Sequence, residues 1–132
     1  MPDEERIAIA SENDIVMARR RGRELAAEGG FSGSDLTIIA TAISELARNI
    51  VAYARAGEMT LRVVRRGDRC GLVVVARDEG PGIHDVSLVM QDGFSTGRSL
   101  GLGLPGAKRL MDEFEIVSEL GQGTTVTMTK WS

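Results

Sequence analysis

The chain has 132 residues, of which 42% are hydrophobic and 27% charged, the composition of a soluble globular protein rather than a disordered or fibrous one. A chain of this length has room for one hydrophobic core, so we expect a single domain over residues 1–132. The net charge of -3 and the 4% of aromatic residues argue against nucleic acid as a partner, because such binders are basic or present stacking rings.

The cellular compartment is indicated by the cysteine and histidine content and by the N-terminus. Cys70 is the one cysteine and His84 the one histidine, which excludes an internal disulfide and leaves too few ligands for a zinc site. The first residues, 1–6, are acidic where a secretory signal would be basic, and no stretch approaches the ~18 apolar residues of a membrane span. We therefore expect a cytoplasmic protein that has no membrane partner.

Hydrophobic periodicity predicts the secondary structure. Apolar residues alternate at 6–10 as in a half-buried strand, and at 34–55 they recur at steps of three and four as on one face of a helix. Ser11 or Asn13 is expected to cap the first helix, and Ser34 the second. The expected elements, in order, are a strand at 6–10, helices at 11–28 and 34–55, strands at 59–63 and 72–76, a helix at 105–114, and strands at 115–120 and 124–131.

This order of elements predicts an α+β fold. We expect a two-layer sandwich in which helices cover one face of a mixed, mostly antiparallel sheet. Seven of the 16 glycines lie between Gly80 and Gly106, so that window is expected to be the loop-rich part of the chain.

Two polar residues interrupt the apolar pattern of the long helix. Glu45 and Asn49 are four residues apart, which places a carboxylate and an amide oxygen one turn apart on the same face. They could converge on one ion or water. Glu/Asn pairs at this spacing are usually exposed and have no binding role, so this pair indicates a site only in combination with other motifs.

A carboxylate and two glycines follow the most apolar expected strand. Asp78 stands at its end, and Gly80 and Gly82 come directly after. An acceptor at a strand end next to bare backbone suits the edge of a pocket for a flat ligand. The alternative is an ordinary Gly-Pro turn with a solvated aspartate.

A third motif, G-x-G-x-x-G, spans residues 101–106. A dinucleotide-binding fold would require a strand directly before it and a further strand and helix after it, and these are missing. A protein-kinase glycine loop would require H-R-D and D-F-G motifs, which do not follow. A glycine-rich segment that leads into a helix N-terminus still favours phosphate, because free N–H groups point outward there.

In combination, the E-x-x-x-N helix, the D-x-G-x-G turn, the G-x-G loop and a closing G-x-G-T turn resemble the GHKL (Bergerat-fold) ATPases. The resemblance runs from about Ser34 to Trp131. Within that superfamily the chain is most similar to the RsbT-type regulatory serine/threonine kinases of the anti-sigma group. This similarity is carried by residues 44–50, 90–96 and 103–114.

The resemblance implies a role for each matching residue. Asn49 would help to hold Mg²⁺, and Glu45 would activate the attacking hydroxyl. Asp78 would accept a hydrogen bond from the adenine amino group, with support from Thr124. Arg98, within an ATP lid at 85–100, would stabilise phosphate charge. The loop residues that would contact the nucleotide are Gly80, Gly82, Gly101, Leu102, Gly103 and Leu104.

The implied function is that of an ATP- and Mg²⁺-dependent protein serine kinase in a bacterial partner-switching pathway of the stress response. Its substrate would be a serine of a STAS-domain antagonist, and the free kinase would activate a serine phosphatase by binding it. The alternative is an ATP-gated anti-sigma factor or adaptor with little catalysis. An unrelated α+β domain without a nucleotide would require four accidental motif matches.

Overall fold

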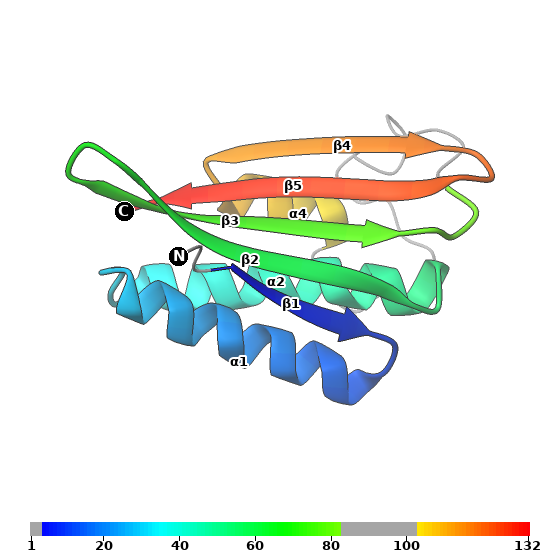
Figure 1. Ribbon diagram of the computed structural model, residues 1–132, viewed down its shortest axis with the longest axis horizontal. Coiled ribbons are helices and arrows are strands. Elements are labelled where there is room, and N and C mark those ends of the chain that lie inside the picture. Colours follow the sequence, from blue (N-terminus) through cyan, green and yellow to red (C-terminus); the bar gives the residue numbers. More distant parts are fainter. Residues whose placement is uncertain (1–3, 83–102) are drawn as a thin grey trace.

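The structure is a computed structural model, and it describes residues 4–82 and 103–132. Its elements follow the expected order (Figure 1). They are β1 (Glu4–Ile9), α1 (Glu12–Glu28), α2 (Ser34–Tyr53), β2 (Gly57–Arg66), β3 (Arg69–Asp78), α4 (Gly103–Leu110), β4 (Glu113–Glu119) and β5 (Gly123–Trp131).

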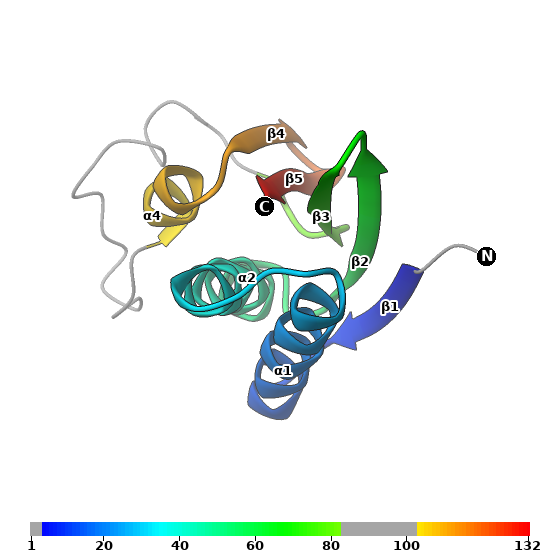
Figure 2. The ribbon, with the colours of Figure 1, turned by 90° about the vertical axis from the view of Figure 1, so that its left-hand side faces the viewer.

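The five strands form one sheet in the order β1-β2-β3-β5-β4. The described strands pair only in the antiparallel sense, so the sheet has no parallel pair among them. Helices α1, α2 and α4 lie on one side of the curved sheet, as Figure 2 shows. The expected two-layer α+β sandwich is therefore confirmed.

The core lies between the sheet and the helices, chiefly α2. Strand side chains alternate, so every second residue of each strand points toward the helix layer. The largest side chains with less than 2% exposure are Ile9, Ile39, Ile43, Leu46, Ile50, Met59, Leu61, Leu72, Val74 and Met128. Each such burial is worth about 1.5–3 kcal/mol. This aliphatic layer fixes how α2 lies across the sheet.

Helix α1 begins as its sequence predicts, and Ser11 is the residue that caps it. The Ser11 side chain accepts a hydrogen bond from the Asp14 N–H at 3.4 Å. Gly22, within α1, faces Ile43 of α2, and a Cβ at this glycine would lie 2.1 Å from the Ile43 Cδ1. The missing side chain therefore allows the two helices to pack closely.

The start of α2 differs from the prediction. The N-cap residue is Gly33, with a φ of 58°, and no side chain caps the helix; Ser34 is its first helical residue. The main chain takes over part of the capping, because the Leu36 N–H donates to the Gly33 oxygen at 3.2 Å. Glycine adopts this positive φ without steric penalty, and that decides the boundary.

The same helix corrects the expectation that no segment reaches the length of a membrane span. By length and composition alone, Ser34–Tyr53 is long and apolar enough to cross one. Within the fold, half of its most apolar window is buried. A core helix of a folded domain passes the same test, and this burial against the sheet accounts for its apolar character.

Helix α4 is shorter at its C-terminal end than predicted. It ends at Leu110, and Phe114 belongs to β4 instead. The Asp112 N–H donates to the Thr129 oxygen at 2.9 Å, and Phe114 then pairs with Met128 of β5. Pairing with β5 therefore overrides the helical pattern of this segment.

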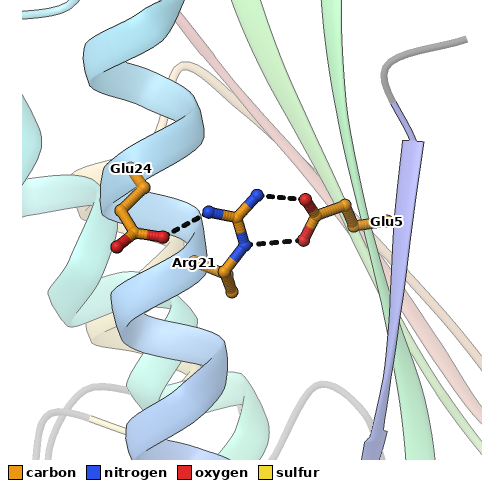
Figure 3. Close-up of polar contacts among 3 residues, drawn as sticks. All are labelled: Glu5, Arg21 and Glu24. Atoms are coloured by element: carbon orange, nitrogen blue, oxygen red, sulfur yellow. Dashed lines mark hydrogen bonds and ion pairs between the residues drawn. The ribbon is translucent and has the colours of Figure 1, made fainter.

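An ion-pair cluster connects the edge strand β1 to α1 (Figure 3). The Arg21 Nε donates to Glu5 Oε2 at 2.8 Å, and the guanidinium also bonds the second oxygen of Glu5 and a carboxylate oxygen of Glu24. The hydrogen bond from Arg21 is the main reason that the pKa of Glu5 is lowered, and Glu5 is the main reason that the pKa of Arg21 is raised.

Replacing Arg21 should therefore destabilise the fold in a pH-dependent way. The pKa of Glu5 is below its ordinary value of 4.5, so its contribution is complete above that pH and is lost as the pH falls through the lowered pKa. Both side chains are about one-third exposed, so Arg21→Gln should reduce the free energy of unfolding by at most about 1 kcal/mol near neutral pH.

Urea unfolding of the parent and of Arg21→Gln, near neutral pH and at about pH 3, measures this difference. Arg20→Gln is the matched control, because Arg20 is exposed and has no ion-pair partner among the described residues. An equal loss for Arg21→Gln at both pH values would contradict the assignment.

Candidate active site

Three segments meet at one end of the sheet: the end of β3, the β4–β5 turn and the C-terminal end of α2 (Figure 1). Asp78, the last residue of β3, pairs with Thr124 on one side and Gly57 on the other. Gly80 follows and lies against Ala54, just after α2. This end of the sheet contains the predicted adenine-binding residues.

Asp78 is held in a fixed orientation by its own turn. Its Oδ1 accepts a hydrogen bond from the Gly80 N–H at 2.9 Å, and its side chain is half-buried. Within the part of the chain that the structure describes, the second oxygen has no hydrogen-bond donor. The Asp78 carboxylate can therefore accept a hydrogen bond from a ligand without losing its own support.

Thr124 lies directly across the strand pair from Asp78 and is buried. Its hydroxyl, however, lies 2.8 Å from the Ser118 hydroxyl, and no hydrogen bond between Thr124 and Asp78 occurs among the described residues. Ser118 also donates to the Gly123 oxygen at 3.2 Å. Thr124 thus supports this corner through strand register and the β4–β5 turn.

Neighbouring segments of the chain pack closely against the glycines around Asp78. A Cβ at Gly80 would lie 2.6 Å from the Ala54 Cβ, and one at Gly82 would lie 2.2 Å from the Glu119 oxygen. A Cβ at Gly123, where φ is 124°, would lie 2.1 Å from the Asp78 oxygen. Protein atoms fill these spaces, so packing alone requires glycine here. Contact of Gly80 and Gly82 with a nucleotide stays a prediction.

On α2, Glu45 is 6% exposed and both of its oxygens are engaged. Oε2 accepts from Arg48 Nη1 at 2.8 Å, and Oε1 accepts from the Gly103 N–H, the first of α4, at 2.8 Å. The sequence did not reveal Arg48 as a site residue. A cation three residues after a carboxylate in a buried helix row is the signal that could have found it.

The N-terminus of α4 faces this carboxylate. Gly103 adopts a φ of 70°, and Leu104 is buried behind it. Free N–H groups and the helix dipole favour an anion at such a terminus. In this structure the Glu45 carboxylate supplies that anion, so a predicted phosphate-binding residue and the predicted base are in direct contact.

Asn49, one turn farther along α2, is half-buried, and the structure shows no hydrogen bond to its side chain within residues 4–82 and 103–132. No group of three His, Cys, Asp or Glu side chains able to hold a metal occurs in those ranges. Mg²⁺ keeps several waters and binds substrate phosphates with one or two protein oxygens, so an unengaged amide oxygen fits such an ion.

Several predicted site residues lie outside the described residues. These are Arg98, Gly101, Leu102 and the expected lid at 85–100. Of the predicted set, the structure brings Glu45 and Gly103 into contact, and it places Asp78 and Thr124 side by side.

An open hollow of about 540 Å³ adjoins the Asp78 corner. Its lining residues are Arg77, Asp78, Glu79, Val117, Glu119, Gly121, Gln122, Gly123, Thr124 and Thr125. By strand alternation, Arg77, Val117 and Thr125 are on the sheet face opposite α2. Asp78 and Thr124 are on the α2 side, so the hollow lies around the end of the sheet and most of its lining is away from the α2 row with Glu45 and Asn49.

Comparison with known proteins decides the family. Residues 9–130 match the histidine kinase-like ATPase domain. The chain belongs to this family. A structural neighbour is found in a chain of the SiaB-SiaC complex from Pseudomonas aeruginosa, with a TM-score of 0.59. That match is 16% identical and covers 98% of this chain and 89% of the other, so it supports the fold alone.

Two relatives of the histidine kinase-like ATPase domain are similar in sequence. Serine/threonine-protein kinase RsbT of Bacillus subtilis (strain 168) is 50% identical over 131 residues, 99% of this chain and 98% of the relative. The anti-sigma F factor of Caldanaerobacter subterraneus subsp. tengcongensis is 35% identical over 103 residues, 74% and 71% of the two chains. The chain is a protein serine/threonine kinase of the partner-switching kind, and its ATPase domain uses ATP.

The contact between Gly123 and Asp78 generates a prediction. Gly123→Ala should reduce the free energy of unfolding by about 3 kcal/mol or more, because the new Cβ meets the Asp78 main chain and φ is positive. Gly121→Ala, in the same turn, is the matched control, because φ is 79° there but nothing lies within 4 Å. The control should lose only about 1 kcal/mol. Equal losses in urea unfolding would exclude the contact as the cause.

Proposed function

We propose that this kinase binds ATP with Mg²⁺ beside α2 and transfers the terminal phosphoryl group to a serine of a STAS-domain antagonist. The 50% identity to a serine/threonine-protein kinase over 99% of the chain carries the proposal. The contact of Glu45 with the N-terminus of α4 supports it, because the proposed base then lies next to the proposed phosphate-binding site.

Adenine recognition is assigned to Asp78. A carboxylate fixed by the Gly80 N–H, with one oxygen open, suits the adenine amino group as a donor. Thr124 keeps this strand end in register. The phosphates are assigned to Gly101, Leu102, Gly103 and Leu104, where the α4 terminus favours negative charge. Gly80 and Gly82 shape the turn below the nucleotide.

Metal binding is assigned to Asn49, whose amide oxygen would complete a shell of phosphate oxygens and waters around Mg²⁺. The ion would neutralise charge on the phosphates. Arg98 is assigned to stabilise the charge that develops on the transferred group.

Proton removal from the acceptor serine is assigned to Glu45. A carboxylate has about four lone-pair sites, so its bonds to Arg48 and Gly103 leave sites for a serine hydroxyl. Arg48 holds the carboxylate in one orientation, and burial keeps water away from it. Phosphoryl transfer requires mainly positioning and charge stabilisation, which these residues supply.

The partners are a further part of this proposal. We infer a STAS-domain protein as substrate and a serine phosphatase that the free kinase activates by binding, in the cytoplasm and with residues 1–132 acting as one kinase domain. Names of the relatives support a protein partner: one is an anti-sigma factor, and one structural neighbour is part of a two-protein complex.

A second candidate is an ATP-gated binding module without significant catalysis, which the 35% identity to an anti-sigma F factor favours. Incubation with labelled ATP, Mg²⁺ and the STAS partner separates the two. A labelled partner supports the kinase, whereas a complex without label supports the binding module.

The adenine assignment predicts that Asp78→Asn weakens ATP binding by about 1–3 kcal/mol, because an amide can present a donor to the adenine amino group. The fold should stay intact, since the side chains have the same shape. Asp68→Asn, in the exposed turn at the other end of β3, is the control and should bind ATP like the parent. Equal ATP affinity of Asp78→Asn and the parent in calorimetry would remove Asp78 from the site.

The base assignment predicts different effects for two changes on α2. Glu45→Gln should slow transfer by ~10²–10⁴-fold, the usual contribution of a general base, and leave ATP affinity almost unchanged. Asn49→Ala should lose Mg²⁺-dependent ATP binding and transfer together. Single-turnover transfer and Mg²⁺-ATP affinity are measured for each variant. Parallel losses in both variants, or full transfer in Glu45→Gln, would exclude Glu45 as the base.

A further inference from the structure

The sheet face opposite the helices is not covered by any element that the structure describes (Figure 2). Strand alternation and register place on it Arg62 and Arg66 of β2, Arg69 of β3 and Trp131 of β5. We call these four residues the arginine–tryptophan surface. They lie toward the hairpin end of the sheet, where β2 turns into β3, because Arg66 pairs with Arg69 and Trp131 pairs with Gly71.

Trp131 is fixed in place on this surface. It pairs with Gly71, and a Cβ at Gly71 would lie 2.7 Å from the Trp131 ring, so the ring lies across bare backbone. Its Nε1 donates to Glu113 Oε2 at 2.8 Å. The guanidinium carbons of Arg66 and Arg69 lie 4.8 Å and 5.7 Å from the ring centroid. Two cations therefore rest on one half-buried aromatic ring.

These cations have no acidic partner within the part of the chain that the structure describes. No carboxylate forms an ion pair with Arg62 or Arg66 among the described residues, and the Nε of Arg69 donates only to the Ser132 main-chain oxygen, at 3.3 Å. The three arginines are exposed. In a chain with a net charge of -3, such a group leaves a local excess of positive charge that a partner can neutralise.

The chemistry of the surface favours a discrete acidic protein segment. Guanidinium groups bind carboxylates in a two-pronged geometry, and tryptophan with arginine is the composition of interface hot spots. A flat anionic membrane or a long duplex would extend beyond these residues onto Glu115 and Glu119 of β4 on the same face, which would repel it.

We propose that the arginine–tryptophan surface docks an acidic segment of a protein partner that is not the phosphoacceptor. Arg69 and Asp78 are at opposite ends of the ten-residue strand β3, about 30 Å apart, so an acidic segment docked here does not itself reach the nucleotide site. In the terms of the proposed function, on which this assignment rests, that partner is the serine phosphatase.

The test uses the full chain with Arg66→Glu and Arg69→Glu combined. The matched control combines Arg19→Glu and Arg20→Glu, the same charge change on two exposed arginines of α1. Calorimetry measures the affinity for the phosphatase and for ATP, and single-turnover kinetics measures transfer to the STAS partner. The chain with Arg66→Glu and Arg69→Glu, called the β2–β3 variant below, should bind the phosphatase at least tenfold more weakly. Its ATP affinity and its transfer rate should be unchanged. The α1 control should match the parent throughout.

Trp131→Phe gives a second readout, because it keeps a ring over Gly71 but loses the bond to Glu113. It should weaken phosphatase binding with little change in transfer. Phosphatase affinity of the β2–β3 variant equal to that of the parent, or an equal loss in the α1 control, would overturn the proposal. A different partner class would also overturn it. The parent would then bind phosphatidylserine vesicles or a DNA duplex, and the β2–β3 variant would lose that binding but still bind the phosphatase. Absence of transfer in the parent itself would overturn the proposed function instead.

Discussion

The buried carboxylate of Glu45 is the constraint on which the arrangement of the site depends. A charge at 6% exposure is stable only if it is paired, and here Arg48 and the Gly103 N–H pair it. One of these bonds lies within α2 and the other joins α2 to α4. The position of the α4 N-terminus, and with it the predicted phosphate site, is thus set by the residue assigned to remove the proton.

The other half of the site is set by the sheet. Asp78 has its position because β3 pairs on both sides and because glycines at 57, 80 and 123 allow neighbouring main chains to approach it. The predicted contacts to adenine and to phosphate therefore depend on different parts of the fold, a strand end and a helix pair. The aliphatic core between α2 and the sheet holds these two parts in register, so loosening it should affect both.

Local sequence patterns predict the fold, and the features that they do not predict depend on tertiary contacts. The period of α2 and the alternation of β1 and β2 predict elements that the structure contains, and the spacing of Glu45 and Asn49 places both on one helix row. The contact from Glu45 to Gly103 spans 58 residues, so no local pattern predicts it. The early end of α4 depends on pairing with β5 in the same way, and the packing role of Gly123 depends on the main chain of Asp78.

The two outermost strands of the sheet have a consequence for solubility. An edge strand offers unpaired main-chain groups to which a second copy of the chain could add a strand. Here β4 carries glutamates at 113, 115 and 119, and β1 begins with Glu4 and Glu5. Glu4 and Glu5 of β1 are paired with Arg6 and Arg21, so it is the β4 edges of two copies that would bring like charges together. The glutamates of β4 therefore disfavour strand addition between two copies at that edge.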